Sequence, residues 1–391
     1  DVFYTYAQFQ EVSWDSVSEN VYMNMRAPYS RPYQVELQEG YTVKPVTGAY
    51  YYGNDSQVRF TGDEACKVDI SHLEDATRVT VRDVPAFEPR YFQMDKTVKN
   101  EDQIGFYGSL EIDHDKISGE ITSQFKEKME NCTVFFNDKL IYLGDVEPGQ
   151  TVEVGNYPVL EYPKNHSFDV ASYLSGQSAF DQADIEDDAY VEAVEKTNLL
   201  SFYLDYYMPS YLSAARVVGI KTNSGSHSGL IRAGDVEGRT VASSNVDVYS
   251  SEDEILYRQA TQRQPKVISG NYDENSNALF GMDPVTLEYS LGSDIWIQRL
   301  TMDFVSDEFL QNGSGTLLKF SGNIYFYNHS TGSFDKQEPA KRDYDSADLA
   351  PYLSPGNTIT VKYVYENNSE YNWDVLLPVL NVMGRTIDDR D

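Results

Sequence analysis

Hydrophobic and polar side chains alternate over most of the first 165 residues, in short runs separated by turn-forming residues. Residues 79–84 read Val-Thr-Val-Arg-Asp-Val, in which apolar and polar side chains alternate over the first four positions. This is the period of a strand with one buried face. Short strands at such spacing predict an antiparallel sandwich or barrel. Further strands are expected at 117–121, 132–136, 141–143 and 151–154.

A Pro-Gly pair precedes a predicted strand at two distant places. The pattern Pro-Gly-x-Thr-apolar-x-Val begins at Pro148 and again at Pro355. In the first copy, Glu147 to Gln150 places Pro and Gly where a type II turn requires them. The pattern Ser-Gly-x-Ile also occurs twice, from Ser118 and from Ser321. The repetition favours two sandwiches of related topology, although any sandwich can use such turns.

The period changes between Phe180 and Tyr207, where apolar residues recur every three or four positions. Acidic residues crowd 181–188, the end at which a helix N-terminus favours negative charge. Pro209 then stops the pattern. We expect one helix here, broken near Thr197.

After the helix the pattern is again typical of strands. Two strands, 215–220 and 246–249, flank a Gly/Ser-rich loop at 223–229. The expected fold is mainly β, with tandem antiparallel β-sandwich or jelly-roll domains and a helical connector. The expected domains are a β-sandwich region at 1–165, which could hold two small sandwiches, a connector with an α+β segment at 166–264, and a jelly-roll-like sandwich at 265–391. The last region should contain strands at 285–289, 295–297, 300–304, 322–327 and 358–364.

The amino-acid composition limits the classes of molecule that this chain is expected to bind. The 391 residues include 62 Asp and Glu against 31 Lys and Arg, a net charge of −31. Phosphate backbones and anionic lipid surfaces would repel such a chain, so nucleic acid and direct membrane contact are not expected. With 31 Tyr and 18 Phe there is ample apolar surface to bury, which argues against disorder.

The start of the chain and its cysteines bear on the compartment. No basic stretch leads into an apolar run, and no run approaches the ~18 apolar residues of a membrane span. We expect an extracellular or cell-envelope ectodomain that is anchored through segments outside this chain. Cys66 and Cys132 could form one disulfide, worth ~4 kcal/mol for a loop of about 65 residues, or remain two buried thiols.

No catalytic residues are predicted. The five histidines show no metal-ligand spacing, and no glycine-rich phosphate loop is present. A glycoside hydrolase needs two carboxylates about 5–10 Å apart, but 62 acidic residues offer too many pairs for the sequence to select one. A carbohydrate-active hydrolase therefore stays open as an alternative function.

No cofactor is expected apart from calcium, which carboxylate-rich segments of an extracellular protein could hold. Neither of two such segments matches a twelve-residue calcium loop, and acids at a helix start explain the first without a metal. The candidate ligands are Asp181, Asp184, Glu186, Asp187 and Asp188, or Asp273, Glu274, Asn275 and Asn277.

Aromatic side chains are the remaining candidates for binding a ligand. The segment 367–374 combines Tyr371 and Trp373, on which a sugar ring could stack, with the amides of Asn368 and Asn372, which could hydrogen-bond to hydroxyl groups. These four residues are the predicted ligand site. The alternative is that Trp373 begins a strand and covers the core.

Residues 295–365 resemble a galactose-binding-like jelly roll. The resemblance rests on the strand at 298–304, the segment Asn323 to Phe334 with its Thr-Gly turn, and a closing strand after Pro355. The chain as a whole is similar to large exported or membrane-anchored ectodomains of Gram-positive bacteria, a family that provides no catalytic motif to transfer. The resemblance implies a fold and a compartment only.

These observations favour a non-catalytic ectodomain that binds a glycan or a cell-surface protein. The alternatives are the hydrolase and a structural spacer. Two facing, unpaired carboxylates with a raised pKa would favour the enzyme. A shallow aromatic platform at a loop tip would favour binding, and a spacer would have neither.

Overall fold

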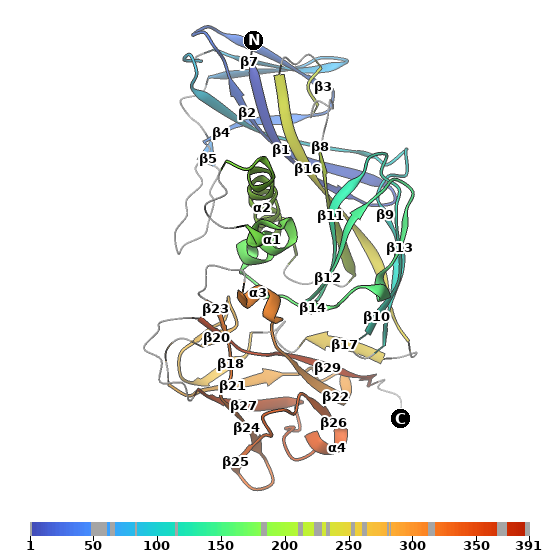
Figure 1. The fold of residues 1–391 in the computed structure, drawn as a ribbon, viewed down its shortest axis with the longest axis vertical. Helices are drawn as coiled ribbons and strands as arrows, with labels where there is room; N and C mark the ends of the chain where they lie inside the picture. The colour runs from blue at the N-terminus through green and yellow to red at the C-terminus, as the bar shows by residue number, and fades with distance from the viewer. Residues whose placement is uncertain are drawn as a thin grey trace.

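The computed structural model describes most of the chain. It covers residues 2–47, 61–62, 67–82, 84–113, 116–180, 186–209, 214–222, 229–231, 235–251, 255–259, 264–279, 281, 283–311, 317–365 and 374–387. Figure 1 shows an elongated molecule with β-sheets at both ends and the helices α1 and α2 between them. The predicted mainly β fold class is confirmed.

The N-terminal part contains sixteen of the described strands and the two longest described helices. The helices are α1 (Ser167–Ser175) and α2 (Asp188–Tyr206), with 3-10 turns at Val154–Asn156 and Gln177–Ala179. The strands are β1 (Phe3–Val12), β2 (Ser16–Arg26), β3 (Tyr33–Gln38), β4 (Thr42–Thr47), β5 (Thr61–Gly62), β6 (Val68–His72), β7 (Ala76–Val81), β8 (Pro89–Lys99), β9 (Phe106–Asp113), β10 (Lys116–Ser123), β11 (Met129–Phe136), β12 (Lys139–Val146), β13 (Thr151–Glu153), β14 (Leu160–Glu161), β15 (Ala215–Thr222) and β16 (Asp235–Ser250).

One large sheet organises this part. Its main path runs β14-β12-β11-β15-β16-β1-β2-β8-β4-β5, and β9, β10 and β13 extend it through β16. The strand β1 pairs in parallel with β16, with Phe3 opposite Asp235. The segment 166–264, expected as a connector, therefore supplies two central strands of the large sheet and does not simply link two β regions.

Helix α2 confirms the predicted helix. Asp187 caps its N-terminus by accepting a hydrogen bond from the backbone N–H of Ala189. The expected break near Thr197 is wrong, because the Thr197 hydroxyl donates to the carbonyl oxygen of Ala193, 2.9 Å away within a continuous helix. Among the described residues, α1 is a second helix in this region that the apolar pattern did not predict.

The C-terminal part contains thirteen described strands and two short helices. The helices are α3 (Asp307–Gln311) and α4 (Ser346–Leu349). The strands are β17 (Ile255–Gln259), β18 (Lys266–Ser269), β19 (Tyr272–Asp273), β20 (Ala278–Leu279), β21 (Val285–Ser290), β22 (Ile295–Asp303), β23 (Leu317–Lys319), β24 (Asn323–Asn328), β25 (Ser333–Lys336), β26 (Asp343–Asp345), β27 (Thr358–Val364), β28 (Asp374–Leu376) and β29 (Val379–Thr386).

Two sheets of this part enclose one core. The sheet β18-β21-β27-β24-β25 faces the sheet β17-β29-β22-β26, and a single apolar cluster joins their inner side chains. The hydroxyls of Tyr289 and Tyr363 lie 3.0 Å apart within this core, which satisfies two buried polar groups. The segments expected as strands at 295–297 and 300–304 form one strand, β22, with a register shift between Ile297 and Arg299.

Three smaller expectations can be compared with the structure. Gly149 has φ 73°, and the Gln150 N–H donates to the Glu147 carbonyl oxygen, as the predicted type II turn requires. Cys132 is a buried free thiol, while Cys66 lies outside the described residues. No helix in the described part of the chain is long and apolar enough to cross a bilayer.

Candidate functional site

The four residues predicted to form the ligand site lie outside the described residues. They are Asn368, Tyr371, Asn372 and Trp373, so this site remains a prediction. The other two tryptophans of the chain are both described and both strongly exposed, Trp14 by 73% and Trp296 by 65%. The described residues contain two hollows of interest, one where the N- and C-terminal parts meet and one beside Trp14.

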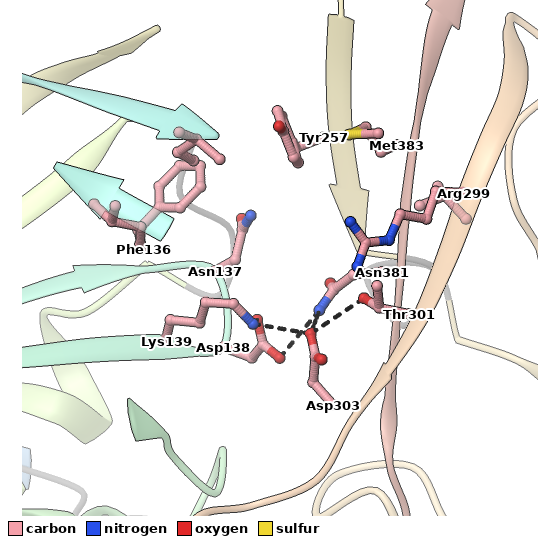
Figure 2. Close-up of a pocket in the computed structure, with 13 residues that line it drawn as sticks. Phe136, Asn137, Asp138, Lys139, Tyr257, Arg299, Thr301, Asp303, Asn381 and Met383 are labelled. Atoms are coloured by element: carbon pink, nitrogen blue, oxygen red, sulfur yellow. Dashed lines mark hydrogen bonds and ion pairs between the residues drawn. The ribbon is translucent and has the colours of Figure 1, made fainter. Parts of the chain in front are cut away.

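The first hollow lies where the turn between β11 and β12 meets the strands β22 and β29 (Figure 2). Its volume is about 50 Å³, room for a few water molecules. Asn137 lies in this turn with φ 56°, a left-handed backbone conformation that Asn tolerates better than most residues. The lining residues are Ile112, Ile117, Phe136, Asn137, Asp138, Lys139, Tyr257, Arg299, Thr301, Asp303, Asn381, Val382 and Met383.

Charged side chains from both parts meet beside this hollow. The Lys139 Nζ lies 2.9 Å from Asp303 Oδ2, 3.7 Å from Glu161 Oε1 and 3.8 Å from Asp138 Oδ1. The Asn381 Nδ2 donates to Asp303 Oδ2 at 2.5 Å and to Asp138 Oδ2 at 3.3 Å. We call Asp138, Lys139, Glu161, Asp303 and Asn381 the charged junction, because Lys139 and Asn381 each bridge the two parts (Figure 2).

At the charged junction, burial and the neighbouring charges act in opposite directions on the pKa values of Lys139 and Glu161. Burial lowers the pKa of Lys139, but the three surrounding carboxylates outweigh it and hold that pKa above its ordinary value. Burial also raises the pKa of Glu161, an effect that Lys139 and a hydrogen bond from Ser306 only partly offset. At neutral pH the lysine is therefore charged and bound to carboxylates.

Because the pKa of Glu161 is raised, we predict that replacing this residue changes the stability of the fold in a pH-dependent way. A carboxyl whose pKa is higher in the folded than in the unfolded state destabilises the fold when ionised. The penalty is absent below the ordinary pKa of Glu and complete above the raised one. Glu161→Gln should therefore raise the free energy of unfolding at slightly alkaline pH, by less than about 1 kcal/mol because Lys139 lies near. Urea titrations should show this gain shrinking as the pH falls; a gain that grows on acidification would contradict the assignment.

This geometry is that of a structural contact between the two parts. A hydrolase needs two carboxylates in a cleft wide enough for a sugar ring, whereas the hollow holds only a few waters. The carboxylates of Asp138 and Asp303 are bridged by Lys139 and Asn381 and are not free to act as acid and base. The junction therefore holds the N- and C-terminal parts together.

The second hollow lies beside the turn that joins β1 to β2. Trp14 occupies this turn, which spans residues 13–16. The Ser13 N–H donates to the carbonyl oxygen of Ser16 at 2.9 Å, and the Ser13 hydroxyl donates to Asp15 Oδ1 at 2.7 Å. Hydrogen bonds from Ser13 and Ser16 lower the pKa of Asp15, so this exposed carboxylate stays ionised well into acid.

Side chains from the segment after β8 fix the backbone of this turn. Asn100, only 4% exposed, donates through Nδ2 to the carbonyl oxygens of Ser13 at 2.7 Å and Ile104 at 2.8 Å. Gln103, with φ 52°, donates through Nε2 to the carbonyl oxygen of Trp14 at 3.2 Å. The indole of Trp14 thus projects into solvent from a backbone that is held on both sides.

The hollow beside Trp14 is open and much larger than the first, about 590 Å³. Because the hollow is open to solvent, this volume is that of a wide surface depression and not of an enclosed pocket. We call it the Trp14 hollow. Its lining residues are Trp14, Asp15, Ser16, Thr97, Val98, Lys99, Asn100, Glu101 and Gln103.

The sequence did not single out Trp14. The sequence does contain a polar turn, Ser-Trp-Asp-Ser, between two stretches in which apolar residues alternate with polar ones. Such a turn with a large aromatic at its tip is a reason to suspect binding. What the sequence could not show is that Asn100 and Gln103, about 90 residues away, lie against this turn.

Some of the predicted calcium ligands accept hydrogen bonds from neighbouring residues, and two lie outside the described residues. Asp187 caps α2. Asp273 accepts hydrogen bonds from the Ser276 hydroxyl and the Asn275 N–H. Asp181 and Asp184 lie outside the described part of the chain. Within that part, no group of three or more His, Cys, Asp or Glu side chains is placed to hold a metal ion.

Comparisons with known proteins give families without an assigned activity. Residues 105–255 match a family model described as a domain of unknown function (DUF8725), and residues 253–384 match another (DUF8815). The boundary between the matches falls where β16 ends and β17 begins. No curated protein matches the chain.

Among solved structures, the chain is similar to the yeast delta-COP-I mu-homology domain. In its complex with a Dsl1 WxWxV peptide, that domain matches at 8% identity with a TM-score of 0.28, covering 63% of this chain and 96% of the yeast chain. The domain alone matches at 9% identity with a TM-score of 0.27, covering 64% and 97%. A likeness at this level carries no functional argument.

Proposed function

We propose that this chain is a non-catalytic ectodomain of the cell surface or envelope that binds a glycan at the Trp14 hollow. One observation carries the proposal: Trp14 is 73% exposed, yet its turn is fixed by buried Asn100 and by Gln103. A large apolar ring held in water costs solvation free energy, and a rigid presentation of it lowers the entropy lost on binding. Both features fit a ligand platform.

A glycan suits the chemistry of this hollow. The indole face offers the apolar surface on which the C–H face of a sugar ring can lie. Around it, Thr97, Lys99 and Glu101 provide the hydrogen-bond donors and acceptors that hydroxyl groups need. The open form of the hollow suits a chain of sugars that enters and leaves along the surface.

The surface location rests on composition. The net charge of −31 disfavours nucleic acid and anionic membranes as partners. The jelly-roll resemblance concerns residues 295–365 of the C-terminal part and does not bear on the Trp14 hollow. The hydrolase alternative gains no support from the junction, where the carboxylates are bridged. The spacer alternative gives no reason for an exposed ring on a fixed turn.

The test compares two exposed tryptophans. On a glycan array, the intact chain should bind a defined set of glycans, and Trp14→Ala should weaken that binding at least about tenfold, the effect of one lost aromatic stacking platform. Trp296→Ala removes an equally large exposed ring on β22, away from the hollow, and should leave binding unchanged.

Two outcomes would contradict the proposal. One is an absence of glycan binding by the intact chain. The other is binding that survives Trp14→Ala, which would move the site elsewhere, for example to Trp373 of the sequence prediction. Equal unfolding temperatures of the two variants would show that a loss of binding does not reflect a loss of fold.

A further inference from the structure

We infer that the glycan bound at the Trp14 hollow is uncharged. The inference rests on the proposed function and adds the chemical class of its ligand. It follows from the signs and positions of the charges that line the hollow and from the field of the whole chain.

The hollow combines both signs of charge. Lys99 contributes one ammonium group, while Asp15 and Glu101 contribute two carboxylates. The next acidic residue, Asp102, is held by Lys126, whose Nζ lies 2.7 Å from its Oδ2. An ammonium group donates hydrogen bonds and a carboxylate accepts them. Together they match hydroxyl groups, which do both, better than they match a ligand of either charge.

A polyanionic glycan meets two obstacles at this surface. Binding a string of carboxylates, sulfates or phosphates needs several basic side chains in a row, and among the residues that line the hollow only Lys99 is basic. The net charge of −31 adds a long-range repulsion. Uronic acid, sulfated and phosphate-bearing polymers are therefore disfavoured.

A cationic glycan meets a different obstacle. The chain as a whole would attract it, but that attraction extends over the entire acidic surface and does not select this hollow. Inside the hollow the ammonium of Lys99 offsets one of the two carboxylates, so the lining presents only one net negative charge to a cation placed on Trp14. The site offers a fixed indole together with hydrogen-bond donors and acceptors. These groups recognise the shape and the hydroxyl groups of a sugar and not its charge.

The experiment measures binding of four hexasaccharides to the intact chain by calorimetry, at low and at physiological ionic strength. The probes are cellohexaose and hexa-N-acetylchitohexaose, both neutral, a fully deacetylated chitosan hexamer, which is cationic, and hexagalacturonate, which is anionic. At least one neutral probe should bind, with a dissociation constant that changes less than about twofold between the two salt concentrations. Trp14→Ala should weaken that binding at least about tenfold.

The outcomes separate this inference from the proposed function. Trp14-dependent binding of hexagalacturonate, or Trp14-dependent binding of the chitosan hexamer alone that weakens steeply with salt, would overturn the neutral class but keep the glycan site. Chitosan binding that Trp14→Ala leaves intact would be general attraction to the acidic surface. If none of the four probes binds in a Trp14-dependent way, both the inference and the proposed site fail.

Discussion

Lys139→Met should lower the free energy of unfolding by about 3 kcal/mol at neutral pH, because it breaks a buried ion pair by removing one partner. The substitution leaves a side chain of similar length but removes the positive charge that lies among Asp138, Glu161 and Asp303. Three carboxylates at the charged junction would then repel one another without a cation, at a place where water reaches them poorly.

The pH dependence identifies the cause. Without Lys139, the pKa of Glu161 loses the cation that partly offsets burial and should rise further, so a proton binds more readily to the folded state. The loss of stability should therefore shrink as the pH falls, because protonation removes the uncompensated charges. Urea unfolding at neutral and mildly acidic pH measures this.

Two further variants serve as controls for this prediction. Adding Asp303→Asn to Lys139→Met should recover part of the loss, because it removes one of the unpaired charges. Lys126→Met breaks an exposed pair with Asp102 and should leave stability nearly unchanged. A Lys139→Met loss no larger than that of Lys126→Met would show that the junction does not hold the two parts together.

Phe309→Ala should cost about 3–5 kcal/mol and weaken the contact between the N- and C-terminal parts. Phe309 is 1% exposed on α3, and its ring centre lies 5.1 Å from that of Tyr173 on α1. The same apolar cluster contains residues of both parts, such as Val170 and Leu317. Removing the ring leaves a cavity at the contact itself.

Differential scanning calorimetry checks this prediction. The intact chain should unfold with its two parts coupled, and Phe309→Ala should lower the transition temperature and separate the transition into two steps. Phe334→Ala, which truncates an exposed ring on β25, should do neither. A single unshifted transition in Phe309→Ala would contradict the role of the cluster.

Local patterns in the sequence were sufficient for the fold class. Alternation along residues such as 79–81 predicts strands because one face of each sheet is buried. Acidic residues before an apolar period of three to four predict the helix α2, whose cap at Asp187 the structure adds. The Pro-Gly turn at Gly149 follows from the φ angle that the position requires. Each of these local features is determined by residues that are only a few positions apart in the sequence.

Contacts between distant segments could not be predicted in this way. The parallel pairing of β1 with β16 joins residues more than 230 positions apart, and no local signal specifies such a partner. For the same reason the segment 166–264 was expected as a connector although β15 and β16 lie in the large sheet. The helix α1 carries only a short apolar pattern and is stabilised by packing on α2 and α3.

The candidate site shows the same limit. The sequence pointed to aromatics beside amides at Tyr371 and Trp373, a site that lies outside the described residues and stays a prediction, and it gave no indication of the similar combination around Trp14. The exposure of Trp14, and its support by Asn100 and Gln103, emerge only when the turn and the segment after β8 lie together.

The most direct test of the Trp14 site uses 19F NMR of the chain labelled with 5-fluorotryptophan. The three tryptophans give three resonances, which Trp14→Phe and Trp296→Phe assign. Addition of a neutral hexasaccharide that binds should shift the Trp14 resonance and leave the Trp296 resonance in place. A shift confined to the resonance of Trp373 or Trp296, with that of Trp14 unmoved, would contradict the account.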